Sequence, residues 1–275
     1  MTSRRQPAFT LIELLTSVAV IGILSGLVAM AVGEARFAAQ KTESASNIRE
    51  LASANLLYAN DNGSFAPNAD FRDVVHWHGK RYGSKFDGTD GYLSPYLDGG
   101  QVRICPVFAD ILEASAGDHF DEGTGGYGYN ATYYGARADL WNAPVAVGAS
   151  RDDYIPWYCR GNLPSRIENA TNTVMFTSTA IVKGGGVVET GNAVPYRHLQ
   201  NGNLGEIATP TCHFRFRGQA IVAWGDGHVT FEEQNDVSTE HNVYSDDNSP
   251  HSVGWFGDID WNGPWNPNSD LQRAY

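Results

Sequence analysis

Residues 9–32 read FTLIELLTSVAVIGILSGLVAMAV, a run of apolar side chains with one acidic residue, Glu13, near its start. At about 1.5 Å per residue, a helix over this run is roughly 36 Å long and can cross a hydrocarbon core of about 30 Å. A charged side chain in such a segment is costly unless it has a partner. The short basic leader MTSRRQPA precedes the run. Cleavage after Ala8 would free the amine of Phe9, one helical turn from Glu13, and supply that partner.

Two simpler interpretations account for this run less well. A secretory signal peptide has an apolar core of about 7 to 15 residues before a small-residue cleavage site, and the run at 9–32 is longer. An ordinary single-pass anchor explains the hydrophobicity but gives no reason for an acid inside the membrane. The position of Glu13 therefore favours a function beyond anchoring.

The residues AFTLIELL, from Ala8 to Leu15, resemble the N-terminal signature of type IV prepilins and the pseudopilins of type II secretion. In that family a membrane peptidase removes the leader and methylates the new N-terminal residue. The resemblance implies cleavage between Ala8 and Phe9 and methylation of Phe9. It also implies that Glu13 pairs with the N-terminus of a neighbouring subunit during assembly. The chain departs from the family at Ala8, where Gly is usual.

Composition narrows the class of partner. The chain has 275 residues and a formal net charge of -12, with a pI near 5.0, which excludes nucleic acid as an expected partner. An acidic surface suits a domain outside the cytoplasm and can attract cations such as Ca²⁺. The roughly 240 residues after the apolar run suffice for one large domain.

Helical character continues beyond the apolar run. Apolar side chains recur at spacings of three and four, which predicts one face of an amphipathic helix: Ile48, Leu51, Ala52, Leu56 and Ala59. Gly63 follows Asn60, Asp61 and Asn62 and can take the left-handed conformation that ends a helix. One helix is therefore expected from the apolar run to about Asn60.

Short strands are expected after the helix, because Gly, Pro and Asn interrupt the chain every few residues apart from a weak helical stretch at Val107–Ala116. The candidates are Val74–His78, Tyr127–Tyr134, Thr173–Thr179, Ile181–Val188, Gln219–Trp224 and His228–Glu232. Gly184 to Gly186 suit a hairpin loop within the fourth candidate. The fold class is α+β, and the resemblance implies a pilin-like long helix packed on an antiparallel sheet.

These boundaries give four predicted segments. They are a leader at 1–8, a transmembrane and assembly helix at 9–32, its amphipathic continuation at 33–62, and a β-rich head at 63–275.

The segment RFRGQAIVAWGDGHV, from Arg215 to Val229, carries a second resemblance. It is similar to the C-terminal element of a large group of bacterial prepilin-like proteins, in which nine residues separate a His from an Asp-Gly pair. Asp226, Gly227 and His228 match its end, but Phe216 stands where the His is expected. The missing imidazole favours a structural hairpin, with the Asp226 carboxylate bonding backbone N–H groups and Gly227 supplying positive φ. A metal-binding Asp226 and His228 pair is the alternative.

Asp258, Asp260, Asn262 and Gly263 form D-x-D-x-N-G, the opening of a calcium loop, in which alternate oxygens surround a hard cation. Ser269 occupies the position of the expected bidentate acid. The simpler interpretation is a polar surface turn. The Trp-rich and Asp-rich tail around it has a composition found in sugar-binding surfaces, although core packing also explains its aromatic residues.

Other candidate sites are weaker. His76 and His78 would share one face of a strand and could hold a metal, but no third ligand can be named. The three cysteines Cys105, Cys159 and Cys212 allow at most one disulfide, whose pairing the sequence does not give. No serine-hydrolase, zincin or dinucleotide motif is present.

The sequence thus predicts a structural subunit of a type IV pilus or type II secretion pseudopilus and not an enzyme. Its expected partners are prepilin peptidase, other pilin-like subunits and the bacterial inner membrane, which it crosses once, with its head in the periplasm or on a filament. No cofactor is expected apart from the calcium alternative. The competing class is an anchored module that binds calcium or carbohydrate without assembling.

Overall fold

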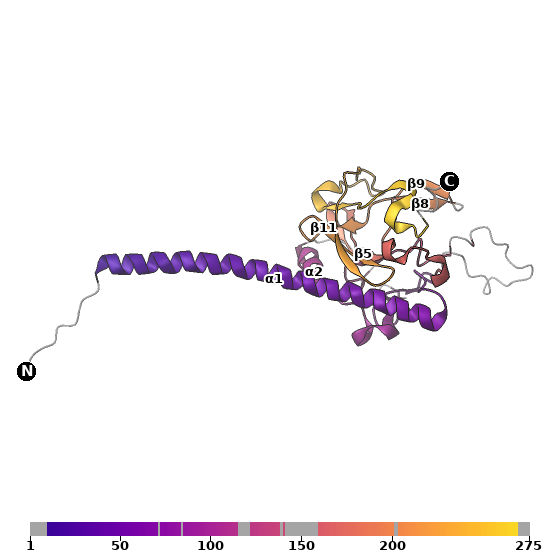
Figure 1. The fold of residues 1–275 in the computed structure, drawn as a ribbon, viewed down its shortest axis with the longest axis horizontal. Coiled ribbons are helices and arrows are strands. Elements are labelled where there is room, and N and C mark those ends of the chain that lie inside the picture. The colour runs from indigo at the N-terminus through magenta and orange to yellow at the C-terminus, as the bar shows by residue number, and fades with distance from the viewer. Residues whose placement is uncertain are drawn as a thin grey trace, which may run out of the picture. The chain divides into compact units, whose positions relative to one another are not determined.

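The computed structural model describes residues 10–70, 72–83, 85–114, 122–137, 140, 159–200 and 203–268. The chain divides into two units, residues 1–42 and 43–275. One continuous helix, α1 (Leu11–Asn62), begins in the first unit and ends in the second (Figure 1). Short antiparallel strands follow it, so the fold is α+β as the sequence predicts.

The remaining elements are short. The second α-helix is α2 (Pro106–Ala114), which covers most of the predicted weak helix. The strands are β1 (Val75–His76), β2 (Gly79–Tyr82), β3 (Lys85–Asp87), β4 (Tyr127–Tyr129), β5 (Val174–Ser178), β6 (Ile181–Lys183), β7 (Gly186–Val188), β8 (Arg197–Gln200), β9 (Asn203–Ile207), β10 (Cys212–His213), β11 (Gln219–Trp224), β12 (Val229–Glu233) and β13 (Val253–Gly254).

The amphipathic stripe on α1 is confirmed. Ile48, Leu51, Ala52 and Ala59 are each at most 5% exposed, while Leu56 is half-buried. The helix ends at Asn62, and Gly63 takes φ 72°. Because only Gly adopts this conformation without a Cβ penalty, the chain leaves the helix there.

Four strands in the order β12-β11-β5-β4 form the central sheet, and each neighbouring pair is antiparallel. All five residues of β5 are buried. Phe176 of β5 stacks on Tyr129 of β4 with ring centroids 4.9 Å apart. The ring centroids of Trp77 and Phe176 lie 5.3 Å apart. These aromatic rings fill the core on which the second part of α1 packs.

Polar side chains join α1 to β4. The amide of Asn55 donates to the Tyr129 hydroxyl at 3.1 Å and accepts from the Ala66 backbone N–H at 2.9 Å. The Tyr129 hydroxyl donates to the Ala66 carbonyl at 3.0 Å. Tyr127 donates to the carbonyl of Ser44 at 3.3 Å. The bonds among Asn55, Tyr129 and Ala66 form a closed set, and together with the separate bond from Tyr127 to Ser44 they give these buried polar groups partners and fix where the helix meets the sheet.

Two predicted strands end more than one residue earlier than expected. The strand predicted at Tyr127–Tyr134 ends at Tyr129, because Asn130 starts a turn: its side-chain oxygen accepts from the Tyr133 N–H and its amide donates to the Val174 and Trp265 carbonyls. The strand predicted at Val74–His78 ends at His76, and the chain reverses into β2. The Ile181–Val188 candidate is a β6–β7 hairpin with Gly184 and Gly185 at its turn.

Candidate functional site

Glu13 lies in the first turn of α1 and bonds to Thr10. Its Oε2 atom accepts from the Thr10 backbone N–H at 2.9 Å and from the Thr10 hydroxyl at 2.7 Å. The Thr10 Oγ1 atom accepts from the Glu13 N–H at 3.3 Å. This reciprocal arrangement is a capping box, which satisfies N–H groups that a helix start leaves without partners. The carboxylate therefore has donors within its own chain, and it remains exposed.

Ala8 and Phe9 lie outside the described residues, which begin at Thr10. Cleavage and methylation at these two positions therefore stay predictions. The amine freed by such a cut would belong to Phe9, which directly precedes Thr10 in the sequence.

The first half of α1 exposes apolar side chains on all sides. Every large apolar residue from Leu11 to Val32 that the structure describes is 54% to 82% exposed. Within the described ranges α1 is the one helix long and apolar enough, by length and composition, to cross a membrane. An apolar surface of this extent needs a lipid or protein environment.

The Asp226, Gly227 and His228 residues form the turn between β11 and β12. Asp226 Oδ1 accepts from the His228 backbone N–H at 3.0 Å and lies 2.6 Å from His228 Nδ1. Burial alone would raise the pKa of Asp226, but its bonds to His228 and the His228 charge lower that pKa below the ordinary value. Gly227 takes φ 90°, and the His228 ring stacks on Trp224. The turn is thus held by its own side chains, and Phe216 is a buried core residue.

The predicted calcium ligands point in different directions. Asp258 and Asp260 are exposed, whereas Asn262 is fully buried. The Asn262 Oδ1 atom accepts from the Arg197 N–H at 2.8 Å, and its amide donates to the Arg197 carbonyl and the Tyr133 hydroxyl. Asn262 would have to leave these bonds to join an ion with the two carboxylates. The calcium site stays a prediction.

The histidine and cysteine candidates lie in packed surroundings. His76 and His78 have ring centroids 5.5 Å apart, and His78 stacks on Phe86. Across the described part of the chain, no three His, Cys, Asp or Glu side chains are placed to hold a metal ion. Cys105, Cys159 and Cys212 are buried free thiols.

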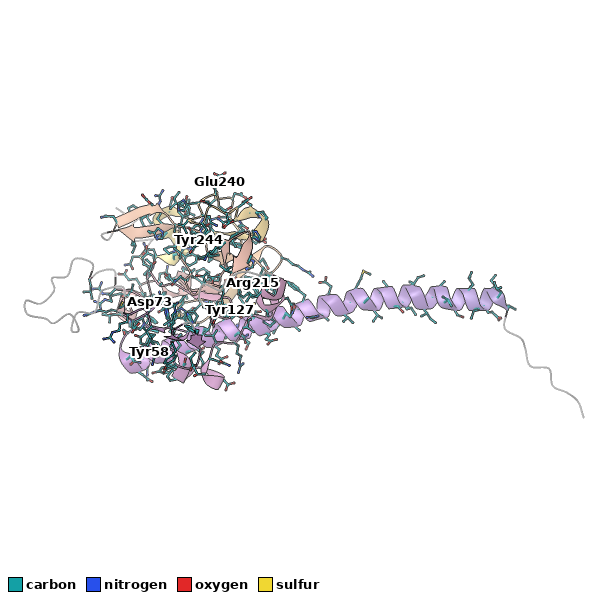
Figure 2. The ribbon with its side chains drawn as sticks, turned by 180° about the vertical axis from the view of Figure 1, so that it is seen from behind. Tyr58, Asp73, Tyr127, Arg215, Glu240 and Tyr244 are labelled. Carbon is teal, nitrogen blue, oxygen red and sulfur yellow. The ribbon has the colours of Figure 1, made fainter. Side chains whose placement is uncertain are left out.

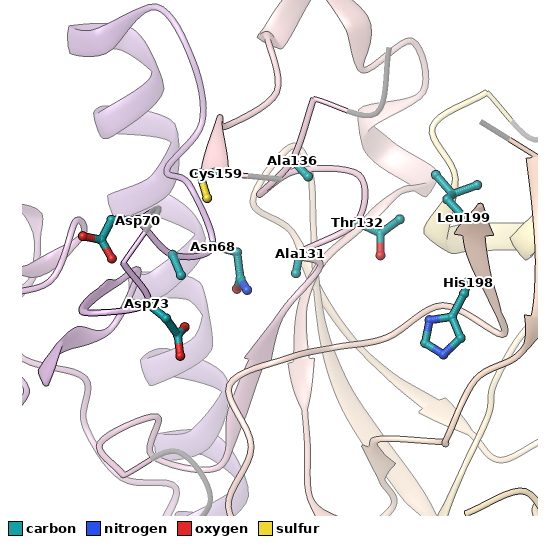
Figure 3. Close-up of a pocket in the computed structure, with 10 residues that line it drawn as sticks. Asn68, Asp70, Asp73, Ala131, Thr132, Ala136, Cys159, His198 and Leu199 are labelled. Carbon is teal, nitrogen blue, oxygen red and sulfur yellow. The ribbon is translucent and has the colours of Figure 1, made fainter. Parts of the chain in front are cut away.

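A pocket of about 510 Å³ lies in the head, and no sequence motif indicated it. Figure 3 shows Asp70 and Asp73 on one side of it and His198 on the other. Its lining comes from segments far apart in sequence, which is why no local pattern revealed it. Burial, with the nearby Asp70 and Asp73 charges, raises the pKa of the lining residue Cys159 to about 11. Its thiol is therefore protonated at neutral pH and a weak nucleophile.

Arg215, labelled with Tyr127 in Figure 2, is a buried cation that sequence reasoning did not single out. Its Nη2 atom donates to the carbonyls of Gly126 at 3.0 Å and Thr179 at 2.6 Å. Its guanidinium carbon lies 4.1 Å from the centre of the Phe108 ring. Burial lowers the pKa of Arg215, although nearby Cys105 and Tyr127 favour its charge. The side chain thus connects α2 to the residue just before β4 and the residue just after β5.

Residues 3–32 match the model of the prokaryotic N-terminal methylation motif. The match and the helix define the class: the chain has a prepilin-type cleavage and methylation motif that includes the start of the long helix α1, whose first part is apolar enough to cross a membrane. The matched region covers part of the leader, the Ala8–Phe9 bond and the apolar run, and it does not extend to the Asp226 hairpin. No curated protein and no solved structure shows significant similarity to the chain.

Proposed function

We propose that this chain is a structural subunit of a type IV pilus or a type II secretion pseudopilus. Prepilin peptidase cuts between Ala8 and Phe9, and the subunit assembles through α1 with other pilin-like subunits. Before assembly the helix crosses the inner membrane once, and the head lies on the periplasmic side. The role is structural and not enzymatic, as is usual for proteins that carry this motif.

The match at residues 3–32 carries this proposal, and the geometry of α1 supports it. Glu13 is an exposed carboxylate at the start of a helix whose apolar side chains are also exposed. In a lipid environment an acid at this position gains most from a positive partner. The terminal amine of a neighbouring subunit is positively charged. In the sequence it also stands at the same end of the chain as Glu13, so the two groups can meet at the same depth in the membrane.

The test replaces Glu13 with Ala in the full-length chain, expressed together with its own assembly genes. We expect filaments sheared from the cells to lose the subunit, while membrane extraction and leader cleavage remain as in the wild type. Glu34→Ala is the matched control, because it removes an acid from the same helix beyond the apolar run. Mass spectrometry of the mature chain should show an N-terminal Phe9 that carries one extra methyl group.

Filaments that incorporate Glu13→Ala as well as the wild-type chain would contradict assembly through this acid. A chain that keeps its leader and never enters filaments would instead support an anchored module that binds calcium or carbohydrate.

A further inference from the structure

The loop from Gly257 to Trp265 contains three consecutive residues with positive φ. Trp261 has φ 53°, Asn262 has φ 66° and Gly263 has φ 44°. Gly accepts such values at little cost and Asn tolerates them, whereas a Trp in this region is strained. Strain of this kind persists only where the surrounding structure imposes it, and it is concentrated at functional positions.

The loop is built to hold this conformation. Asn262 is buried and bonded to Arg197 and Tyr133, and the Asn266 amide donates to the Trp261 carbonyl at 3.0 Å. A Cβ at Gly263 would lie 1.6 Å from the Asp258 carbonyl oxygen, so no other residue fits there. These contacts fix the backbone on both sides of Trp261.

The side chain of Trp261 itself is exposed at the surface. It is 45% exposed, whereas Trp77, Trp255 and Trp265 are each 1% exposed, and Trp224 is partly buried. Asp258 and Asp260 next to it are also exposed. The loop therefore carries an exposed indole ring and two exposed carboxylates on a backbone that these bonds hold in place, which lowers the entropy lost on binding.

We propose that Trp261, with Asp258 and Asp260, forms a binding platform for the pyranose rings of a neutral polysaccharide. The C–H face of a pyranose ring is flat and apolar and can stack on an indole, and its hydroxyls are donors that carboxylates accept in charge-assisted bonds. The same carboxylates, on a chain of net charge -12, repel anionic polymers. A contact between proteins is less well matched, because charged residues are depleted from the core of such an interface, and two acids come just before Trp261 in the sequence.

The test uses the full-length protein in detergent micelles, with cellulose, xylan, chitin and mannan as neutral probes and polygalacturonate as an anionic probe. We expect binding to at least one neutral polymer and none to polygalacturonate. Trp261→Asn should weaken that binding at least about tenfold. The same variant should melt at the wild-type temperature or roughly 2 °C above it, because Asn relieves the strain. Tyr82→Ala removes another exposed aromatic residue of the head and should change binding less than about twofold.

Failure to bind any neutral polymer would overturn the platform, as would binding that Trp261→Asn leaves intact. If Trp261→Asn binds sugars like the wild type but no longer enters filaments, the exposed ring is a subunit contact instead. Because Glu13 is intact in every variant, loss of sugar binding is distinguishable from failure of assembly through the helix.

Discussion

The two halves of α1 obey opposite rules of burial. From Leu11 to Val32 the large apolar side chains are exposed, whereas further along the polar side chains Ser44, Asn47 and Asn55 are buried. A water-soluble helix buries its apolar face and exposes its polar face. The first half is therefore suited to a lipid or protein environment, while the second half uses polar groups to fix its position on the head. A single helix can thus serve two surroundings if its side chains change along its length.

The largest expected effect comes from making the same substitution, Leu to Ala, in each half of α1. Leu51 is 1% exposed and Leu24 is 55% exposed. Leu51→Ala should lower the free energy of unfolding of the head by about 3 kcal/mol, because it removes buried contacts and leaves a cavity. Leu24→Ala should change it by less than about 0.5 kcal/mol. Urea unfolding in detergent, followed by tryptophan fluorescence, measures both; equal losses would contradict the division of the helix.

The polar contacts of the second half provide a smaller test. Asn55→Ala leaves the buried Ala66 N–H without its acceptor, which should cost about 2 kcal/mol. Ser53→Ala, on the exposed face of the same turn, should cost less than about 0.5 kcal/mol. The same urea titration compares the two variants, and a cost for Asn55→Ala no larger than its control would show that the network does not fix the helix.

Acid should weaken the head gently through its buried histidines. Burial, with His76 and Arg81 nearby, lowers the pKa of His78 well below 6.5, and burial beside Arg215 and His251 does the same for His213. Below about pH 6.5 the unfolded chain binds protons that the folded head does not, so stability falls as the pH falls.

Melting temperatures recorded between about pH 7.5 and about pH 5.5 measure this dependence. His78→Phe should flatten the curve. A wild-type melting temperature independent of pH in this interval would contradict neutral buried histidines.

The sequence predicts the features that depend on local patterns. The long helix follows from the apolar run and the stripe through Ile48, and its end follows from Gly63. The β11–β12 hairpin follows from the Asp-Gly turn.

The features that the sequence did not predict depend on contacts between distant segments. Arg215 bonds to carbonyls at Gly126 and Thr179, and no pattern around Arg215 indicates this. The acidic neighbours of Asn262 predict that it is a calcium ligand, yet its side chain is buried and bonds to Arg197 and Tyr133. Asn130 ends a strand through bonds to Val174 and Trp265. A polar residue has the same local signature whether it is solvated or buried, so its partner is known only from the fold.

The burial of Ser44, Ile48 and Asn55 also determines which fragments of this protein can be made soluble. Removing the whole of α1 would take away one wall of the core and expose Tyr127 and Tyr129. A soluble fragment therefore has to begin near Glu43, before the first of these buried residues, where the second unit of the chain begins. Expression trials that start after Gly63 should yield aggregated protein.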